Sequence, residues 1–345
     1  MSLAAPAVGE DFSGLPRSYT IREGLVIEPN LVLAPMEGVT DVTFRRLVRQ
    51  IGGCGMTFTE FIPAHGLSHR SARELLMAQF DPEERPITIQ VFGNEPAVLA
   101  EGARVAQDLG CDVIDLNMGC PSKKVCAHSG GSALMKEPEL VREIVAAMRA
   151  AVQIPFTVKM RAGWDPEHEN AVEIAKISEG EGAEAIAVHW RTRTEKYGGT
   201  RRLDTIAAVK QAVGVPVLAN GDIVDVPSAR ETLEQTGADG LMIGRGAIRD
   251  PWVFQRILAA QHGRCQPVVD AWEKERVLLG YFEDIRARFR TDLGALGRFK
   301  KIAKYFVDGV EGGDTLKTTV LRSQTPEEAI AHIEAHFAGL RQLAG

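Results

Sequence analysis

Eight short apolar runs rich in β-branched residues recur between residues 31 and 244, and this repeat restricts the possible folds more than any other feature of the chain. The runs span residues 31–36, 56–60, 87–91, 113–117, 156–160, 185–189, 216–220 and 241–244. Helix-like stretches separate them; within residues 139–152, for example, Leu140, Ile144 and Met148 recur at helical spacing. Nearly continuous apolar strands that alternate with amphipathic helices indicate a parallel sheet covered on both faces. Eight such units favour a (β/α)8 barrel, an α/β fold, over the alternative of an open, doubly wound sheet.

The regions on either side of the repeat have a different character. Residues 1–30 show no clear periodicity, and we interpret them as an N-terminal arm. After the last run the chain is rich in helix formers, and helices are expected over residues 271–290 and 326–343. Thr325, Pro326 and Glu328 have the pattern of a capping box at the start of the second of these helices. The sequence therefore predicts a barrel over residues 31–255 and a smaller, all-helical domain over residues 256–345.

Composition and charge exclude several classes of protein. No apolar run approaches the 18 or so residues needed to span a bilayer, and the N-terminus has neither the basic region nor the apolar stretch of a signal peptide. Five cysteines are few and odd in number, which favours free thiols and a cytoplasmic setting. The net charge of −6 argues against indiscriminate nucleic-acid binding but allows a local basic face.

Polar residues close four of the apolar runs: Asn117, Lys159, His189 and Asn220. In a barrel these positions lie on the rim at the carboxyl ends of the strands, where active sites are built. A lysine that points into the mouth is partly desolvated and needs an anionic partner. A reduced flavin anion is one such partner, and a local carboxylate is the alternative.

Glycines follow the seventh and eighth runs. Gly221 comes directly after Asn220, and the eighth run continues into Gly244, Arg245 and Gly246. A glycine after a strand, followed by an arginine and a small-residue turn, exposes backbone N–H groups beside a cation. Since the loops after strands seven and eight are the usual phosphate site of this barrel, we predict phosphate binding there.

Cys120 lies just beyond the fourth run, in a loop with Pro121 and two lysines. A cysteine there has the chemistry of a nucleophile, a metal ligand or a proton donor. Cys126 and His128 are near in sequence, but the chain has no Cys-x-x-Cys pair, so we expect no metal site.

Several segments together are similar to the tRNA-dihydrouridine synthases. They are residues 34–41 (APMEGVTD), 116–123 (LNMGCPSK), 158–161 (VKMR), 188–189 and 191–192 (VH and RT), 219–222 (ANGD) and 244–246 (GRG). The resemblance covers roughly residues 31–310 in one order. The run from Cys120 to Val125 and the pair Gly163–Trp164 resemble the B-type branch most closely.

The resemblance implies an oxidoreductase that reduces uridines in the tRNA D-loop to 5,6-dihydrouridine, with FMN bound over the barrel mouth and NADPH or NADH as electron donor. Its expected flavin-binding residues are Pro35, Met36, Glu37, Gln90, Lys159, His189, Asn220, Gly221, Asp222, Gly244 and Arg245. Asn117 and Arg161 would contact the target uracil. Cys120 would be the general acid that protonates C5 while the flavin supplies a hydride to C6, because a neutral thiol with an ordinary pKa of about 8.5 is mostly protonated at pH 7. Two departures from the family pattern are Trp190, which stands where glycine is usual, and Cys126.

The C-terminal region carries a basic segment that would bind the tRNA backbone. Residues 286–304 contain seven cations and one acid, a local net charge of +6: Arg286, Arg288, Arg290, Arg298, Lys300, Lys301 and Lys304 against Asp292. Among them we expect Arg298, Lys300, Lys301 and Lys304 to contact tRNA. A solvated helix face is the structural alternative.

Two other functions remain open at this point. An FMN barrel that acts on a free small molecule, such as a dihydroorotate dehydrogenase, shares the phosphate loops and the lysine but does not require a basic helical domain. A barrel that binds RNA or a nucleotide without catalysis would take up no FMN. Neither a membrane nor an obligate protein partner is indicated.

Overall fold

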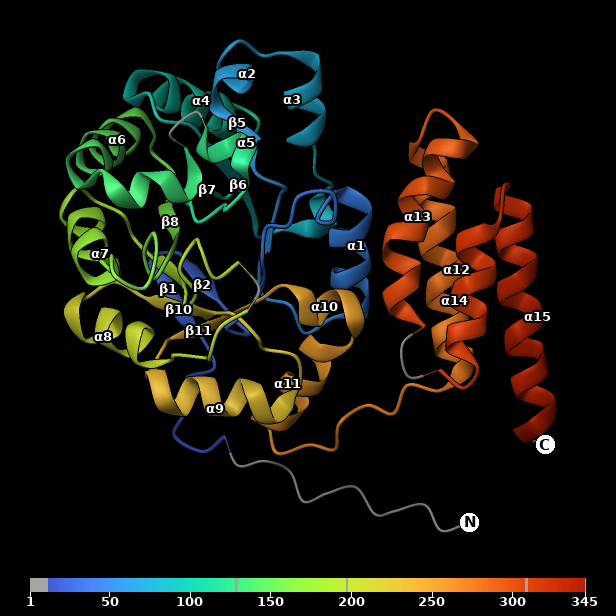
Figure 1. Ribbon diagram of the computed structural model, residues 1–345. Coiled ribbons are helices and arrows are strands. Elements are labelled where there is room, and N and C mark those ends of the chain that lie inside the picture. The colour runs from blue at the N-terminus through green and yellow to red at the C-terminus, as the bar shows by residue number, and fades with distance from the viewer. Residues whose placement is uncertain (1–11, 128–129, 197, 308–309, 345) are drawn as a thin grey trace.

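The computed structural model describes residues 12–127, 130–196, 198–307 and 310–344, and it contains the predicted barrel (Figure 1). Eight parallel strands coincide with the eight apolar runs: β3 (Leu31–Leu33), β4 (Thr57–Phe58), β6 (Ile87–Phe92), β7 (Val113–Met118), β8 (Phe156–Arg161), β9 (Ile186–His189), β10 (Val217–Asn220) and β11 (Gly240–Ile243). Hydrogen-bonded neighbours follow the order β3-β11-β10-β9-β8-β7-β6-β4, and β5 (Ile62–Pro63) pairs with β6. A parallel bridge between Val32 and Met56 closes the ring. The prediction of a (β/α)8 barrel is confirmed.

Helices surround the barrel and connect successive strands. The longer ones are α1 (Val42–Ile51), α4 (Pro96–Asp108), α6 (Pro138–Ala151), α7 (Ala171–Gly180), α8 (Asp204–Ala212), α9 (Val226–Thr236) and α11 (Val253–Gln261). Short helices lie in the loops: α2 (Ala64–Ser68), α3 (Ala72–Met77), α5 (Lys123–Cys126), α10 (Arg245–Arg249) and the 3₁₀ turns η1 (Pro82–Glu84) and η2 (Gly131–Lys136). Local sequence sets their ends. Helix α9, for example, begins after Asp225, whose carboxylate accepts the N–H of Ser228, and ends at Gly237 with φ of 63°.

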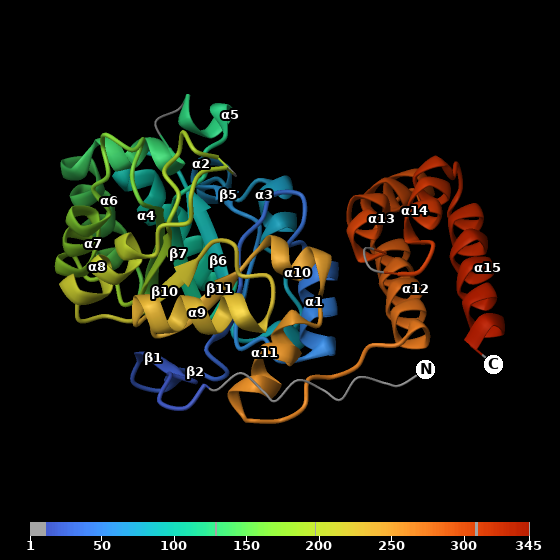
Figure 2. The ribbon, with the colours of Figure 1, turned by 60° about the horizontal axis from the view of Figure 1, so that its bottom comes forward.

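The floor of the barrel is closed by part of the N-terminal arm. Residues Tyr19–Arg22 (β1) and Leu25–Ile27 (β2) form an antiparallel hairpin, which lies at the opposite end of the barrel from α5 (Figure 2). Tyr19, Ile21 and Ile27 join the apolar cluster that fills the barrel interior. The arm is therefore not structureless where it is described, because its alternating apolar residues complete the core.

Four helices make up the C-terminal region: α12 (Ala271–Arg288), α13 (Asp292–Phe306), α14 (Gly313–Arg322) and α15 (Pro326–Ala344). Phe282 of α12 stacks on Phe299 of α13, with 4.0 Å between the ring centroids. The capping box of α15 forms in part: the hydroxyl of Thr325 accepts the N–H of Glu328, but the Glu328 carboxylate accepts the N–H of Gln324. No helix in the described part of the chain is long and apolar enough to cross a membrane.

Arginine–carboxylate pairs join the helical region to the barrel. Arg298 of α13 is only 7% exposed, and it forms an ion pair with Asp41 at 2.6 Å and donates to the carbonyl oxygens of Gly38 and Val39. Arg288 forms a similar pair with Asp81, also at 2.6 Å. A buried guanidinium with three protein acceptors is not available to RNA, so the expectation that Arg298 contacts tRNA is corrected: this residue holds the two regions together.

Candidate active site

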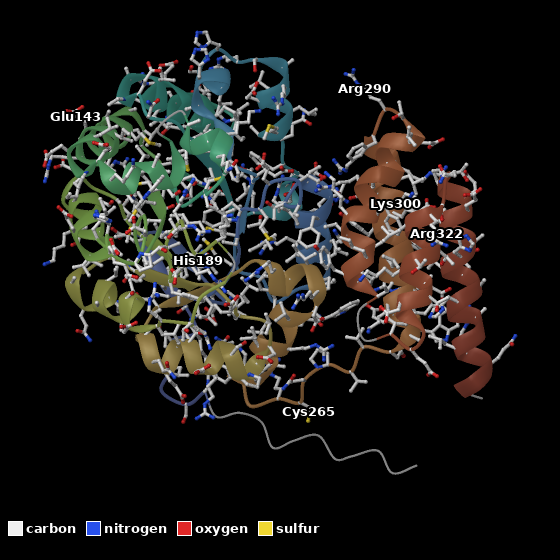
Figure 3. The ribbon with its side chains drawn as sticks, viewed as in Figure 1. Glu143, His189, Cys265, Arg290, Lys300 and Arg322 are labelled. Atoms are coloured by element: carbon white, nitrogen blue, oxygen red, sulfur yellow. The ribbon has the colours of Figure 1, made fainter. Side chains whose placement is uncertain are left out.

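The polar residues that close the apolar runs meet at one end of the barrel. Strand register places Asn117 beside Lys159, and His189 between Arg161 and Asn220. The Nζ of Lys159 donates to the Oδ1 of Asn220 at 3.0 Å. Figure 3 shows His189 over the barrel, whereas Lys300 and Arg322 lie on the C-terminal helices. The four strand-end residues therefore form one cluster, as their sequence positions predicted.

A buried hydrogen-bond chain lies below this cluster. Thr157 and Gln90 donate to the two carboxylate oxygens of Asp115, at 2.6 and 2.7 Å, and Asn117 donates to the Oε1 of Gln90 at 2.7 Å. Desolvation raises the pKa of Asp115 to about 6. Sequence reasoning missed Asp115, although its spacing of two from Asn117 on β7 puts both side chains on the same face. The Gln90 amide is fully buried and holds Asn117, so its contact with a flavin remains a prediction.

Asn117 in turn holds the loop that carries Cys120. Its Oδ1 accepts the backbone N–H groups of Gly119 and Cys120, at 3.0 and 2.9 Å. On the other side of the loop, the carbonyl of Cys120 accepts the hydroxyl of Ser132 at 2.9 Å. Cys126 also contacts this carbonyl, whereas His128 lies outside the described residues. The position of Cys120 is thus held by hydrogen bonds to its main chain.

Burial controls the protonation of the groups in the mouth. The Cys120 side chain is largely buried, which raises the pKa of its thiol and keeps it neutral at pH 7. Burial, together with the nearby Arg161, lowers the pKa of Lys159 to about 8. Burial and the surrounding cations hold the pKa of His189 well below its ordinary value. The mouth therefore presents an uncharged acid, a neutral imidazole and a lysine that holds its proton weakly.

Arg161 joins the Cys120 loop to the loop after β9. Its guanidinium donates to the carbonyl oxygens of Gly119 at 2.7 Å and of Thr192 at 2.8 Å, and the residue is 4% exposed. The expected contact of Arg161 with a uracil stays a prediction, since the bonds seen are to the protein backbone.

The loops after β9, β10 and β11 form a cationic corner. The carboxylate of Asp222 bridges Arg191 and Arg245, with 2.6 Å to each guanidinium. Gly221 has φ of 115°, and a Cβ on it would lie 2.6 Å from both His189 and Trp190, so no other residue fits. Trp190 is fully buried beneath Gly221, and its Nε1 has no hydrogen-bond partner among the described residues. Arg191 was not among the expected site residues. Its ion pair with Asp222, a residue far from it in sequence, places it in the site.

The loop after β3 completes the rim. The hydroxyl of Thr40 accepts the N–H of Met36, and the N–H of Thr40 donates to the carbonyl of Met36. A Cβ on Gly244 would lie 3.5 Å from the sulfur of Met36, so the ends of β3 and β11 approach closely. Pro35 and Glu37 flank Met36, and Glu37 is exposed. The expected flavin residues of this loop thus share one rim with Gly244.

Three of the seven cations in the basic segment, including Arg298, are neutralised by acids from other parts of the chain. Arg286 pairs with Glu327 at 3.1 Å, and Arg288 pairs with Asp81. The Nζ of Lys300 donates to the carbonyl of Ser323 at 2.5 Å, and Lys304 lies 4.6 Å from the ring centroid of Tyr305. Lys301 is exposed, and its Nζ approaches Gly38 on the rim of the mouth. The usable positive charge is therefore smaller than the sequence window suggested.

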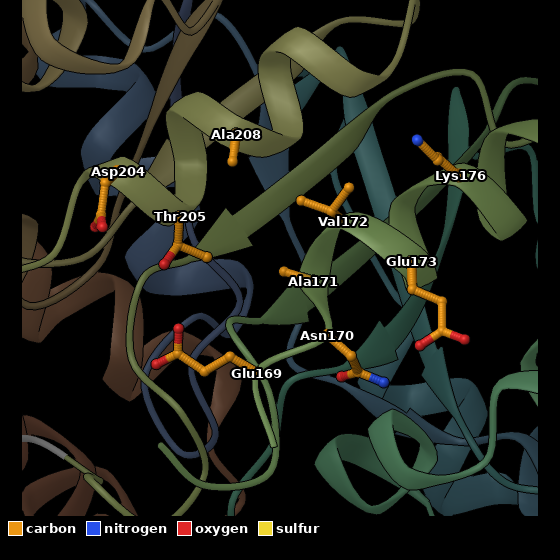
Figure 4. Close-up of a pocket in the computed structure, with 9 residues that line it drawn as sticks. All are labelled: Glu169, Asn170, Ala171, Val172, Glu173, Lys176, Asp204, Thr205 and Ala208. Atoms are coloured by element: carbon orange, nitrogen blue, oxygen red, sulfur yellow. The ribbon is translucent and has the colours of Figure 1, made fainter. Parts of the chain in front are cut away.

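A separate groove is lined by none of these site residues. It measures about 690 Å³ and runs between the amino ends of α7 and α8 (Figure 4). Glu169, Glu173 and Asp204 line it, with Lys176 at one edge. An acidic groove outside the ring of strands does not suit an anionic ligand.

Comparisons with known proteins identify proteins that are similar to this chain. The family model described as dihydrouridine synthase matches residues 32–341. A tRNA-dihydrouridine synthase B from Pseudomonas aeruginosa is 39% identical over 320 residues, which is 92% of this chain and 96% of that protein. A protein of the same name from Yersinia pestis is 37% identical over 90% of this chain and 96% of its own length. A probable tRNA-dihydrouridine synthase from Rhodobacter capsulatus is 37% identical over 92% and 97%.

Proposed function

The chain belongs to the dihydrouridine synthase family of oxidoreductases, and from this premise we propose that it reduces uridines of the tRNA D-loop to 5,6-dihydrouridine, with FMN as cofactor and NADPH or NADH as electron donor. The observation that carries the proposal is the neutral, buried thiol of Cys120 at the rim of a mouth that also holds Lys159. The same premise and the free thiols support a cytoplasmic location.

The residues present fit a flavin mononucleotide. Gly221 and Gly244 keep two strand ends clear of side chains, and Arg191 and Arg245 place two guanidiniums beside them. Guanidinium groups such as these bind phosphate oxygens through charge-assisted hydrogen bonds. The buried N–H of Trp190 is a further donor that lacks a partner among the described residues. Bound FMN would supply the hydride that a protein side chain cannot.

Lys159 is suited to lie beside an anion. Its Nζ is bonded to an amide oxygen, Asn220 Oδ1, and not to a carboxylate, although Asp115 interacts with it electrostatically. Because desolvation disfavours the ammonium, an anionic ligand that restores the lost stabilisation would be bound strongly. His189 stays neutral beside it and offers a hydrogen bond without a charge.

Cys120 would deliver the proton to C5 of the uracil. A general acid must carry its proton at the working pH, and burial ensures this for the thiol. Asn117 and Ser132 hold the Cys120 main chain from both sides, so the loop contacts that position the Sγ do not depend on the sulfur itself. Arg161 stiffens the same loop through Gly119.

The target uridine must leave its stack to reach the mouth, at a cost of a few kcal/mol, and contacts to the rest of the tRNA must offset this. Lys301, beside the rim, and Lys304 and Arg290 on the helical region are cations of the basic segment that would make such contacts. Asn117 and Arg161 would then contact the uracil.

The decisive test compares substrates. Purified, FMN-loaded protein should form dihydrouridine in tRNA transcribed without modifications and should leave free uridine unchanged. Turnover of a free pyrimidine, with none on tRNA, would support a small-molecule oxidoreductase instead. A protein that binds tRNA but retains no FMN would support a non-catalytic role. Mapping dihydrouridine in tRNA from a strain that lacks this protein would identify the position that it modifies.

A further inference from the structure

Two cations lie against one indole ring at the rim of the barrel mouth. The ring is that of Trp164, which follows β8; Lys136 ends η2, and Arg193 lies in the loop after β9. The Nζ of Lys136 and the guanidinium carbon of Arg193 each lie 4.5 Å from the centroid of the Trp164 ring. Cation–π attraction therefore holds both positive charges at one point.

Neither cation has an acidic partner in the described part of the chain. No ion pair or side-chain hydrogen bond joins Lys136 or Arg193 to a described residue, and the buried Nε of Arg193 has no acceptor there. Two of the acids near them in sequence are engaged elsewhere. Asp165 accepts from His168 at 2.7 Å, and Glu195 accepts from Arg202 at 2.9 Å. Since most arginines of this acidic chain are paired, two uncompensated cations at one ring stand apart.

Backbone hydrogen bonds tie Trp164 and Arg193 to the strand end that reaches the Cys120 loop. The N–H of Arg193 donates to the carbonyl of Gly163, and the N–H of Thr194 donates to that of Trp164. Three residues before Trp164, Arg161 bonds to Gly119, the neighbour of Cys120. Trp164 and Arg193 thus belong to the strand end and the loop that Arg161 joins to the Cys120 loop, and Lys136 approaches their ring from the end of η2.

We propose that Lys136 and Arg193, positioned by Trp164, bind phosphodiester groups of the single-stranded RNA segment that flanks the uridine in the mouth. The proposal rests on the proposed function, because that function brings a nucleotide strand to this rim. Phosphates suit the site: guanidinium and ammonium groups bind phosphate oxygens, and single-stranded RNA exposes its backbone. This contact surface lies on the barrel and is separate from the basic segment of the helical region.

Negative charge on the groove between α7 and α8 favours an RNA backbone that runs past Lys136 and Arg193 instead. The groove between α7 and α8 is lined by Glu169, Glu173 and Asp204, which would repel a phosphate backbone. Lys176 at the edge of that groove is exposed, like Lys136, but its surroundings are acidic (Figure 4). Lys176 is therefore a matched control: the same residue type on the same barrel, outside the proposed path.

The test measures binding of unmodified tRNA to FMN-loaded protein as a function of salt. We expect Lys136→Ala and Arg193→Ala each to weaken binding roughly fivefold at low salt and to reduce the log–log salt slope by about 0.7, the value for one phosphate on a single strand. Trp164→Leu should lower both the tRNA affinity and the salt slope. Trp164→Phe, which keeps an aromatic ring, should restore both to the wild-type values. Lys176→Ala should change neither. Flavin absorbance and the rate of flavin reduction should remain those of the wild type in all five variants.

The outcomes separate this proposal from the proposed function. If wild-type protein binds tRNA but forms no dihydrouridine, the proposed function fails, while the salt slopes still decide the phosphate contact. If the Lys136→Ala, Arg193→Ala double variant binds tRNA with the affinity and salt slope of the wild type, the proposal is overturned. A Trp164→Leu variant that loses thermal stability but keeps the wild-type salt slope would assign Trp164 a purely structural role and overturn its part in positioning.

Discussion

Replacing Cys120 by alanine should slow one step, the reoxidation of the reduced enzyme by tRNA. General acid catalysis contributes about 10² to 10⁴-fold. Cys120 is 8% exposed, so water would reach the vacated position poorly and replace the thiol inefficiently. We therefore expect a loss in the upper half of this range, about 10³-fold or more.

The rest of the protein should tolerate this change. Asn117 and Ser132 bind the main chain of residue 120, so the loop keeps its contacts in the alanine variant. Loss of one nearly buried sulfur should lower the free energy of unfolding by about 1 kcal/mol. FMN content, reduction by NADPH and tRNA affinity should all stay close to those of the wild type.

Rapid mixing of pre-reduced enzyme with unmodified tRNA, followed by flavin absorbance, measures the step directly. Cys120→Ser is the matched control for shape, because a hydroxyl of similar size is a much weaker acid and should be nearly as slow as alanine. Reoxidation of the alanine variant within about threefold of the wild-type rate would remove Cys120 from the mechanism. A serine variant as fast as the wild type would show that the thiol contributes shape and not acidity.

Three further predictions concern the cofactor, the RNA surface and pH. Arg245→Ala should weaken FMN retention, since the phosphate loses a charge-assisted bond; flavin occupancy that survives extensive dialysis would contradict this. Lys301→Ala with Lys304→Ala should weaken tRNA binding and reduce its salt dependence without changing the flavin spectrum, and unchanged affinity at low salt would move the RNA surface elsewhere. Because the pKa of Lys159 in the folded protein is about 8, below its unfolded value, the unfolded chain binds more protons at alkaline pH. The free energy of unfolding of the flavin-free protein should thus rise from about pH 8 toward pH 10, and Lys159→Met should reduce that rise in denaturant titrations; an identical pH profile in the variant would refute the assignment.

Local pattern was sufficient for the barrel and for the positions of its rim residues. A period of two along β7 to β10 determines which side chains face inward, and the end of each apolar run places Asn117, Lys159, His189 and Asn220 at the carboxyl edge. These features depend on neighbours in sequence. The eight strands and the cluster at the mouth were therefore predictable before any contact was known.

Contacts between residues far apart in sequence determined the charge of the basic segment, the N-terminal hairpin and the protonation of the site. The basic segment looked like a single charged face, but Asp41, Asp81 and Glu327 neutralise three of its arginines, and none of these acids lies within it. The β1–β2 hairpin likewise depends on tertiary contacts, because its apolar side chains pack into the interior of the barrel. Protonation also depends on the fold, because the pKa of Cys120 is set by burial. Sequence periodicity reports the direction of a side chain, whereas charge pairing and desolvation depend on which distant groups tertiary packing brings within a few ångströms.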